Sequence, residues 1–371
     1  MKKILAMLLS FMLVMSASIT AFGATTSDVD KTLKSSVKFT YGDKTAFDIS
    51  ESKDYYLYLI AGEYDENIEK SYFNSVKQAL DGGEQFDIGT LGLIISNMVL
   101  SLEDPTDFEG YNVLDMFEKA ELSEYDNMYT YMYAADIAFL FDFDALGKQL
   151  CDTLISKYTM GKGTDFWGGY GTSPDDLAVF IITLSAYYEE YEAYIKDALT
   201  LLKAYNTEAG YDNYGANANS TALALAAFVS ADDEAAANDA YSKLMLFYNK
   251  ETGGFNSSFD DILATKDAIF GLSYYWLLAD IDDDTDDDEN DNSTVTDNEE
   301  KPANPIVNIK DKTDTDNSAS ANKNNADSVK TENEQKTQLK SPATGAGTVA
   351  FALITMLSAG GVMLVSRKKE N

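Results

Sequence analysis

Apolar residues along this chain define two kinds of helical segment that alternate. In the first kind nearly every position is apolar or small, and such a helix must be buried on all sides. The second kind is amphipathic, as at 192–205, where Ile195, Leu199 and Leu202 share one helical face. Segments of the first kind lie at 54–62, 88–102, 129–143, 175–188, 219–230 and 265–279. The pattern predicts six inner helices wrapped by amphipathic outer ones, with almost no strand.

The partner of the last inner helix has to come from elsewhere in the chain. Five inner segments are followed by an amphipathic helix, but 265–279 is followed by an acidic tract. An amphipathic helix is predicted near the N-terminus, where Val29, Leu33 and Val37 recur at helical spacing. We expect this helix to pack beside 265–279 and close a ring.

Three segments in the second half of the domain repeat one motif. Each has a glycine, an aromatic residue, a polar loop, a capping residue and an apolar helix. The glycines are Gly169, Gly210 and Gly254. A period of roughly 40 to 45 residues is typical of helical hairpins stacked in an array or a ring.

Residues 28–281 resemble the α/α toroid superfamily. The segments most similar to its repeats are Thr252-Gly253-Gly254-Phe255 and Asn219-Ser220-Thr221-Ala222. Its members include terpene and squalene cyclases, protein prenyltransferases, cobalamin carriers and the thioester domains of alpha-macroglobulins. The resemblance implies an all-α (α/α)6 toroid of six inner and six outer helices, but it specifies function poorly.

Composition divides the chain into four parts. Residues 1–24 combine Lys2 and Lys3 with an apolar run and small residues, which is typical of a secretory signal peptide. The toroid domain follows at 25–281. Residues 282–340 are rich in Asp and Asn with few large apolar residues, which predicts a disordered linker. Residues 341–371 hold a C-terminal signal.

The C-terminus resembles a sortase sorting signal of Gram-positive surface proteins. Ser341-Pro342-Ala343-Thr344-Gly345 is similar to the common Leu-Pro-x-Thr-Gly pattern, with Ser341 in place of Leu. The uncharged run 346–365 is long enough to be a transmembrane helix, and a basic cluster follows it. The resemblance implies a sortase as partner, cleavage after Thr344 and covalent attachment to peptidoglycan at the cell surface. An ordinary single-pass membrane anchor is the alternative.

Charge and composition exclude several functions. The formal net charge is −34, which disfavours nucleic acid and anionic lipid as partners. The absence of histidine excludes His-ligated metal sites and the Ser-His-Asp triad. Cys151 is the single cysteine, so there is no intrachain disulfide and no Cys-based zinc site. We expect neither a metal nor a cofactor.

Asp175 and Asp176 are the candidate catalytic acids. Ser173-Pro174-Asp175-Asp176 resembles the Asp-x-Asp-Asp motif of class II terpene cyclases, with Asp175 at the proton-donor position and Ser173 in place of the first acid. The alternative is a plain helix start, because proline and acids favour the first helical turn.

Six residues are candidates for ligand binding. If the inner helices are parallel, their N-termini meet at one rim, together with the loops that carry the aromatic residues. Aromatic faces beside polar groups suit a glycan or a flat organic molecule, although the same rings also serve as packing plugs. The candidates are Trp167, Tyr170, Tyr211, Asn219, Phe255 and Lys266.

The sequence therefore favours a cell-wall-anchored surface protein that displays a toroid for binding a glycan or a small organic molecule. A second interpretation is an (α/α)6-barrel polysaccharide hydrolase or lyase with paired carboxylates. A third is a purely structural head on a stalk. The carboxylates available to the enzyme are Asp175, Asp176, Asp212, Asp260 and Asp261.

Overall fold

The described part of the chain is almost entirely helical. The computed structural model describes residues 26–123, 127–161 and 173–286. Twelve α-helices and one short 3-10 helix lie in these residues, and the only strands there are two of two residues each. The elements are α2 (Thr26–Tyr41), η1 (Ile49–Glu51), α3 (Ser52–Ile60), α4 (Glu66–Asp81), α5 (Ile88–Leu100), α6 (Val113–Glu118), α7 (Met128–Leu140), α8 (Asp144–Gly161), α9 (Pro174–Ser185), α10 (Tyr188–Ala204), β1 (Asn206–Thr207), β2 (Gly210–Tyr211), α11 (Ala218–Ser230), α12 (Glu234–Leu244) and α13 (Asp261–Asp286).

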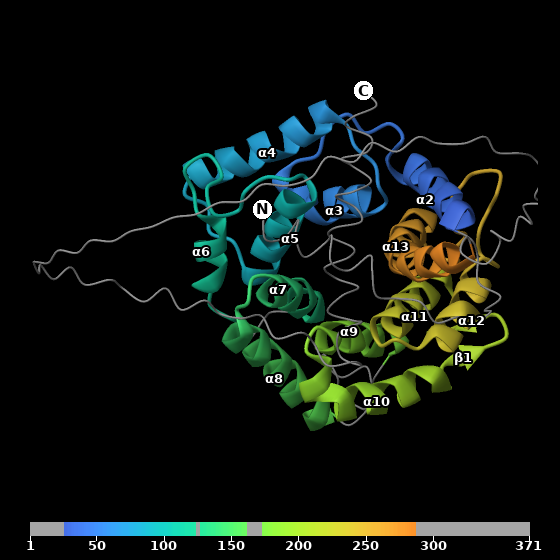
Figure 1. The fold of residues 1–371 in the computed structure, drawn as a ribbon. Coiled ribbons are helices and arrows are strands. Elements are labelled where there is room, and N and C mark those ends of the chain that lie inside the picture. Colours follow the sequence, from blue (N-terminus) through green and yellow to red (C-terminus); the bar gives the residue numbers. More distant parts are fainter. Residues whose placement is uncertain (1–25, 124–126, 162–172, 287–371) are drawn as a thin grey trace, which may run out of the picture.

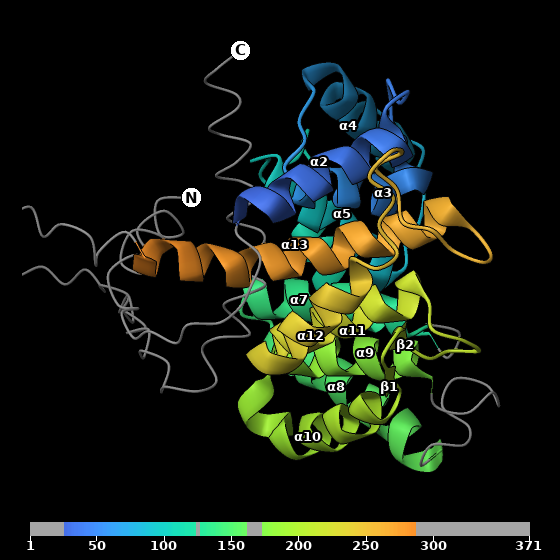
Figure 2. The same cartoon turned by 90° about the vertical axis from the view of Figure 1, so that its right-hand side faces the viewer.

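The helices form an inner and an outer set. Contacts run in order from α3 to α5, α7, α9, α11 and α13, and α13 in turn contacts α3. The outer helices α6, α8, α10 and α12 pack against α5, α7, α9 and α11 respectively. Figure 1 shows α4, α6, α8, α10, α12 and α2 around this inner set, and Figure 2 shows it from the side.

The all-α prediction is confirmed. The inner segments predicted at 88–102 and 219–230 correspond to α5 and α11, which differ from them by at most two residues at either end. The agreement has a simple cause. Helix α11 is buried around nearly its whole circumference, so its sequence must be apolar at almost every position.

Small residues let neighbouring inner helices approach closely. A Cβ at Gly271 of α13 would lie 2.4 Å from the carbonyl oxygen of Ala222 on α11. A Cβ at Gly92 of α5 would lie 2.9 Å from the carbonyl oxygen of Tyr133 on α7. No side chain fits into either space, so these glycines are required by helix-to-helix packing.

The N-terminal helix α2 is the outer partner of α13, as the sequence predicts. The two helices are in contact, and Val29, Leu33 and Val37 of α2 are buried. The Ser36 hydroxyl donates to the carbonyl of Gly253 at 3.1 Å, across 217 residues of sequence. The first helix of the described part, α2, therefore packs against the last one, α13.

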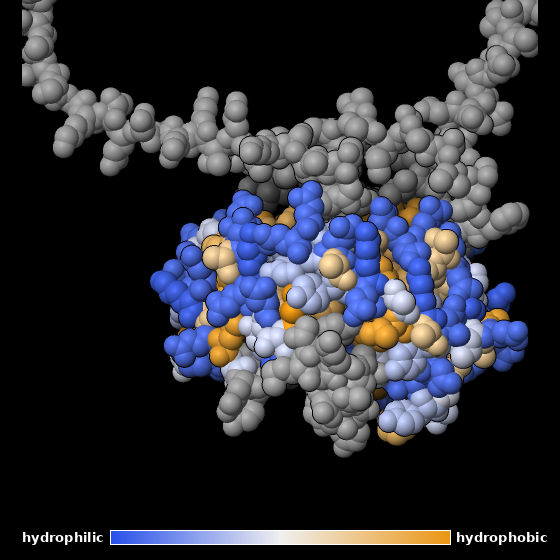
Figure 3. All heavy atoms as spheres, turned by 90° about the horizontal axis from the view of Figure 1, so that it is seen from below, coloured by the Kyte–Doolittle hydropathy of each residue, from blue (hydrophilic) through white to orange (hydrophobic). Residues whose placement is uncertain are grey.

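Several predicted segments lie outside the described residues: the signal peptide 1–24, most of the linker 282–340, and the sorting signal 341–371. Helix α13 extends to Asp286, beyond the predicted domain limit of 281. No helix in the described part is long and apolar enough to cross a membrane. Seen from the side of α8 and α10, the surface is mainly hydrophilic (Figure 3).

Candidate functional site

The first turns of the inner helices carry polar side chains that gather at one end of the domain. We call this set the mouth cluster. Its members are half-buried, with the exception of Ser220, which is buried. They are Lys53 and Asp54 of α3, Tyr129 of α7, Asp175 and Asp176 of α9, Asn219 and Ser220 of α11, and Lys266 and Asp267 of α13, joined by Asn213 from the loop before α11.

Asp175 sits in the first turn of α9. Ser173 caps the helix, its hydroxyl accepts from the Asp176 N–H at 3.1 Å, and Pro174 occupies the first turn. The Asn213 amide donates to Asp175 Oδ2 at 3.2 Å. Oδ1 is buried and makes no hydrogen bond of regular geometry, although the Ser220 hydroxyl is close enough to affect the carboxyl.

The pKa of Asp175 is raised to about 6, and burial is the largest cause. The charges of Asp267 and Asp176 also raise this pKa, whereas hydrogen bonding to the Ser220 hydroxyl and the Asn213 amide lowers it. Burial also raises the pKa of Asp176, and the hydrogen bonds from Ser173 oppose this shift. Asp175 is therefore a carboxyl that changes its charge near neutral pH.

Asp267 faces the same space from α13. The Asn219 amide donates to Asp267 Oδ2 at 2.9 Å. Burial raises the pKa of Asp267, while Lys53, the Asn219 hydrogen bond and Lys266 act to lower it. Asp175 and Asp267 are 92 residues apart in sequence, yet the charge of Asp267 acts on Asp175.

Cations and aromatic rings complete the mouth cluster. Lys266 Nζ pairs with Asp54 Oδ1 at 2.7 Å, and the Tyr41 hydroxyl donates to the same oxygen at 3.1 Å. Lys53 Nζ lies 5.2 Å from the centre of the Tyr129 ring. The pKa of Tyr129 is raised by burial and by the charges of Asp267, Asp175 and Asp176, so carboxylates of α9 and α13 both act on this side chain of α7.

The aromatic residues of the repeat loops are packing residues where the structure describes them. Tyr211 and Phe255 are completely buried, and their rings contact Phe228 and Tyr248. The prediction that these two rings form the apolar walls of an open mouth is therefore wrong. The glycine before each ring turns the chain inward, and the ring fills the gap under the loop. Trp167 and Tyr170 lie outside the described residues.

A repeated hydrogen bond holds these loops. The Tyr211 N–H donates to Thr221 Oγ1 at 3.0 Å, and the Phe255 N–H donates to Thr265 Oγ1 at 2.9 Å. Each threonine hydroxyl also donates to the helix carbonyl four residues earlier. One threonine thus ties each loop to the first turn of the next inner helix.

Three other carboxylates proposed for catalysis point elsewhere. Asp212 Oδ1 accepts from the Gly215 N–H at 2.8 Å. Asp260 Oδ1 accepts from the N–H groups of Ile262 and Leu263, and Asp261 Oδ1 accepts from the Ser257 N–H. All three are exposed residues that shape loops or helix starts.

One more carboxyl, Asp136, is buried in the middle of α7. Its Oδ1 has no hydrogen-bond partner, and burial holds its pKa well above the ordinary value. A charge on Asp136 would raise the pKa of the nearby Tyr56, Tyr133 and Tyr274. Burial therefore favours the neutral form of Asp136 in the core.

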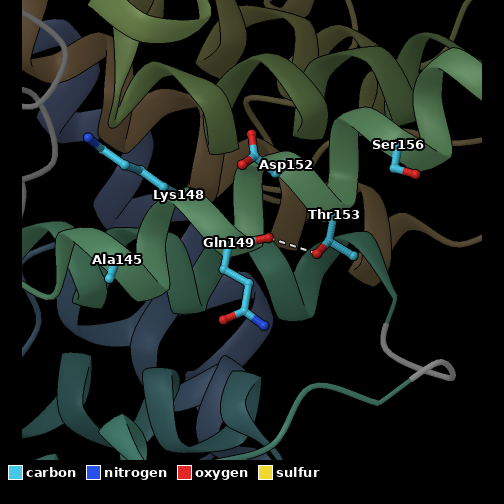
Figure 4. A pocket seen from close by; sticks show the side chains of 6 residues that line it. All are labelled: Ala145, Lys148, Gln149, Asp152, Thr153 and Ser156. Atoms are coloured by element: carbon cyan, nitrogen blue, oxygen red, sulfur yellow. Dashed lines mark hydrogen bonds between the residues drawn. The ribbon is translucent and has the colours of Figure 1, made fainter.

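A shallow depression lies on the surface of α8. It is lined by residues of that helix alone (Figure 4). Its polar groups are engaged in the fold: Thr153 Oγ1 donates to the Gln149 carbonyl at 2.7 Å, Lys148 pairs with Glu190 at 2.7 Å, and Asp152 accepts from the Tyr191 hydroxyl at 3.0 Å. This surface connects α8 to α10 and presents no comparable convergence of helix N-termini. Among the described residues, no group of three or more acidic, cysteine or histidine side chains is placed to hold a metal ion.

Sequence reasoning missed Lys53, Asp54 and Tyr129. All three come from helices that lack the Gly-aromatic motif, which drew attention to the second half of the domain. The sequence could have indicated these residues, because each of them falls in the first two turns of an inner helix.

Comparison with known proteins adds no assignment. No family model matches the chain, and neither a curated protein nor a solved structure matches it.

Proposed function

We propose that this chain is a secreted, cell-wall-anchored surface protein whose helical domain is an (α/α)6 toroid that binds a glycan. The toroid is supported by the cyclic order of contacts among α3, α5, α7, α9, α11 and α13. The presence of an outer helix beside each of these inner helices supports it as well.

The observation that carries the binding function is the mouth cluster. N-termini of inner helices converge there, and the helix dipoles add positive partial charge. The cluster combines amide, hydroxyl, ammonium and carboxylate groups with the half-buried ring of Tyr129, over which Lys53 lies. Mixed hydrogen-bonding groups beside an aromatic face suit a ligand with many hydroxyl groups and little charge.

The binding function is tested with the full chain and a panel of neutral polysaccharides: cellulose, xylan, mannan, starch and purified peptidoglycan glycan strands. At least one should retard the protein in affinity electrophoresis. Asn219→Ala and Lys53→Met should weaken that binding about tenfold, because each removes a polar group of the mouth. Glu208→Gln, an exposed change in a loop, is the matched control. Equal binding by the mouth variants and the control would place the ligand elsewhere.

The proposed address rests on the sequence of the C-terminus. Sortase cleavage predicts a mature chain that ends at Thr344 and carries a peptidoglycan fragment. Mass spectrometry of protein released from cell walls by a muramidase tests this directly. A mature chain that retains residues 346–365 would indicate a membrane anchor instead.

A polysaccharide hydrolase or lyase is a second candidate, and one observation favours it. Asp175 has a pKa of about 6, and the charge of a second half-buried carboxyl, Asp267, acts on it. A carboxyl with such a pKa is suited to general acid catalysis, and a second carboxylate nearby supplies a base or nucleophile. If the polysaccharide that binds is also cleaved, release of reducing ends should stop in Asp175→Asn and in Asp267→Asn. Undiminished cleavage in either variant would contradict this role.

A further inference from the structure

Two aromatic side chains stand almost fully out of the surface. Among the described residues, Tyr214 is 96% exposed and Phe259 is 92% exposed, whereas Tyr194 on α10 is 37% exposed. Tyr214 lies in the loop that enters α11, and Phe259 lies in the loop that enters α13. Figure 2 shows both loops projecting from the side of the domain on which α13 begins, which is the side of the mouth cluster.

The loop around Tyr214 is fixed by hydrogen bonds. Tyr214 has φ +60°, a left-handed conformation that costs an ordinary residue about 1 kcal/mol. The Gly215 N–H donates to Asp212 Oδ1 at 2.8 Å, and the Asn217 amide donates to the Gly215 carbonyl at 3.0 Å. Tyr214 thus has a strained backbone in a loop that hydrogen bonds hold, and burial of its ring does not offset that strain. Local strain of this kind is commonly found at binding sites.

Phe259 is braced from below in a similar way. Its N–H donates to Ser257 Oγ at 3.1 Å, and Asp260 caps the start of α13 through the N–H groups of Ile262 and Leu263. Ile262 is 51% exposed and Leu263 44% exposed, so three exposed apolar side chains lie close together in sequence at the start of α13. Exposed apolar groups that the fold holds in place have a contact function more often than isolated ones do.

The surroundings of the two rings define the ligand. Each loop contributes carboxylate, amide or hydroxyl groups beside its ring, namely Asp212 and Asn213 in one and Ser257 and Asp260 in the other. No lysine or arginine occurs in 209–217 or 256–263, so neither loop attracts a nucleic acid or an anionic lipid. Exposed rings that alternate with hydrogen-bonding groups suit the apolar faces and hydroxyl groups of sugars.

We propose that Tyr214 and Phe259 are contact rings for an extended, uncharged polysaccharide that lies across the mouth cluster. This proposal rests on the glycan-binding function above and names the residues that contact the polysaccharide. The two loops enter neighbouring inner helices, and packed helices are about 8–10 Å apart. A ligand that reaches both rings is therefore longer than one sugar unit, and the half-buried Asn219 and Lys266 lie at the starts of the same two helices.

The experiment compares ring variants of the full chain on the polysaccharide that the wild type binds. Tyr214→Ala and Phe259→Ala should each weaken binding about tenfold, and the double variant should weaken it further. Tyr214→Phe should retain most of the affinity, because the ring face is kept. Tyr194→Ala removes an exposed tyrosine from the outer helix α10 and should leave binding unchanged. Short and long oligosaccharides of the same sugar should differ in affinity only when both rings are present.

Thermal unfolding keeps folding defects apart from binding defects, since both rings are exposed and their truncation should leave Tm unchanged. Wild-type binding that persists in the double variant would overturn the ring proposal and leave the glycan function standing. Failure of the wild type to bind any polysaccharide of the panel would overturn both. A basic helical peptide of Lys and Leu serves as a probe for protein docking. If this peptide binds the wild type in a Phe259-dependent way and no glycan does, the surface is a protein-docking site and the proposal is wrong.

Discussion

Burial at the mouth cluster changes the protonation of single carboxyl groups. Asp175 is half-buried near two other carboxyls, Asp176 and Asp267, and its pKa of about 6 compares with an ordinary value of 3.8. Between these two values the folded chain binds a proton that the unfolded chain has lost. Stability contributed by this proton is present at low pH and is lost as the pH rises through about 6.

Asp175→Asn should therefore stabilise the domain at pH 7.5, by on the order of 1–2 kcal/mol, and flatten its stability between pH 4 and 6. The asparagine still offers an oxygen to the Asn213 amide. Urea unfolding across this pH range gives the measurement, with Glu208→Gln as the exposed control. Parallel pH curves for wild type and Asp175→Asn would show that this carboxyl is ionised at no cost.

At the scale of elements, each described repeat loop is joined to its helix by one threonine. Thr221 and Thr265 accept the backbone N–H of the buried aromatic ten residues earlier. This bond matters because a buried N–H without a partner costs about 1–3 kcal/mol. The glycine, the aromatic and the threonine therefore act as one unit, and the ring fills the space that the turn creates.

Thr221→Val and Thr265→Val should each lower the free energy of unfolding by about 1–3 kcal/mol, since valine keeps the shape and removes the acceptor. Thr200 in α10 supplies the matched control. Its hydroxyl also donates to the carbonyl four residues earlier, but it is exposed and has no loop to hold. Urea midpoints test the energies, and hydrogen exchange at the Tyr211 amide should become faster in Thr221→Val. A cost as small as that of Thr200→Val would rule out the proposed anchoring role.

At the scale of the whole molecule, closure depends on contacts between distant parts of the chain. Helix α2 covers α13, and Lys266 of α13 pairs with Asp54 of α3. Close packing at Gly253 and Gly254, where an added Cβ would meet Ser35 and Phe39, shows how tightly the N-terminal helix fits. The packing of the last inner helix, α13, thus depends on the N-terminal helix α2.

Removal of residues 26–41 should expose the apolar face of α13 and destroy cooperative unfolding, because no later segment of the described chain can cover that face. Dye binding to exposed apolar surface and size-exclusion chromatography measure the effect, and a synthetic 26–41 peptide added in excess should partly restore the transition. Removal of residues 287–340 is the control and should leave Tm unchanged. An intact, cooperative domain without α2 would refute this account of closure.

The sequence alone determined the helical class, the positions of the inner helices and the partner of the last one. Burial on all sides requires apolar residues all round, and that requirement is visible in one dimension. Tertiary structure alone decided which polar groups meet. Asp175 and Asp267 come together because the chain circles back on itself, and no local pattern records that path. Likewise Tyr211 is buried while Tyr214, three residues later, is exposed. Both are tyrosines in one polar loop, and only the direction of the backbone at Gly210, Tyr214 and Gly215 separates a packing residue from a surface ring.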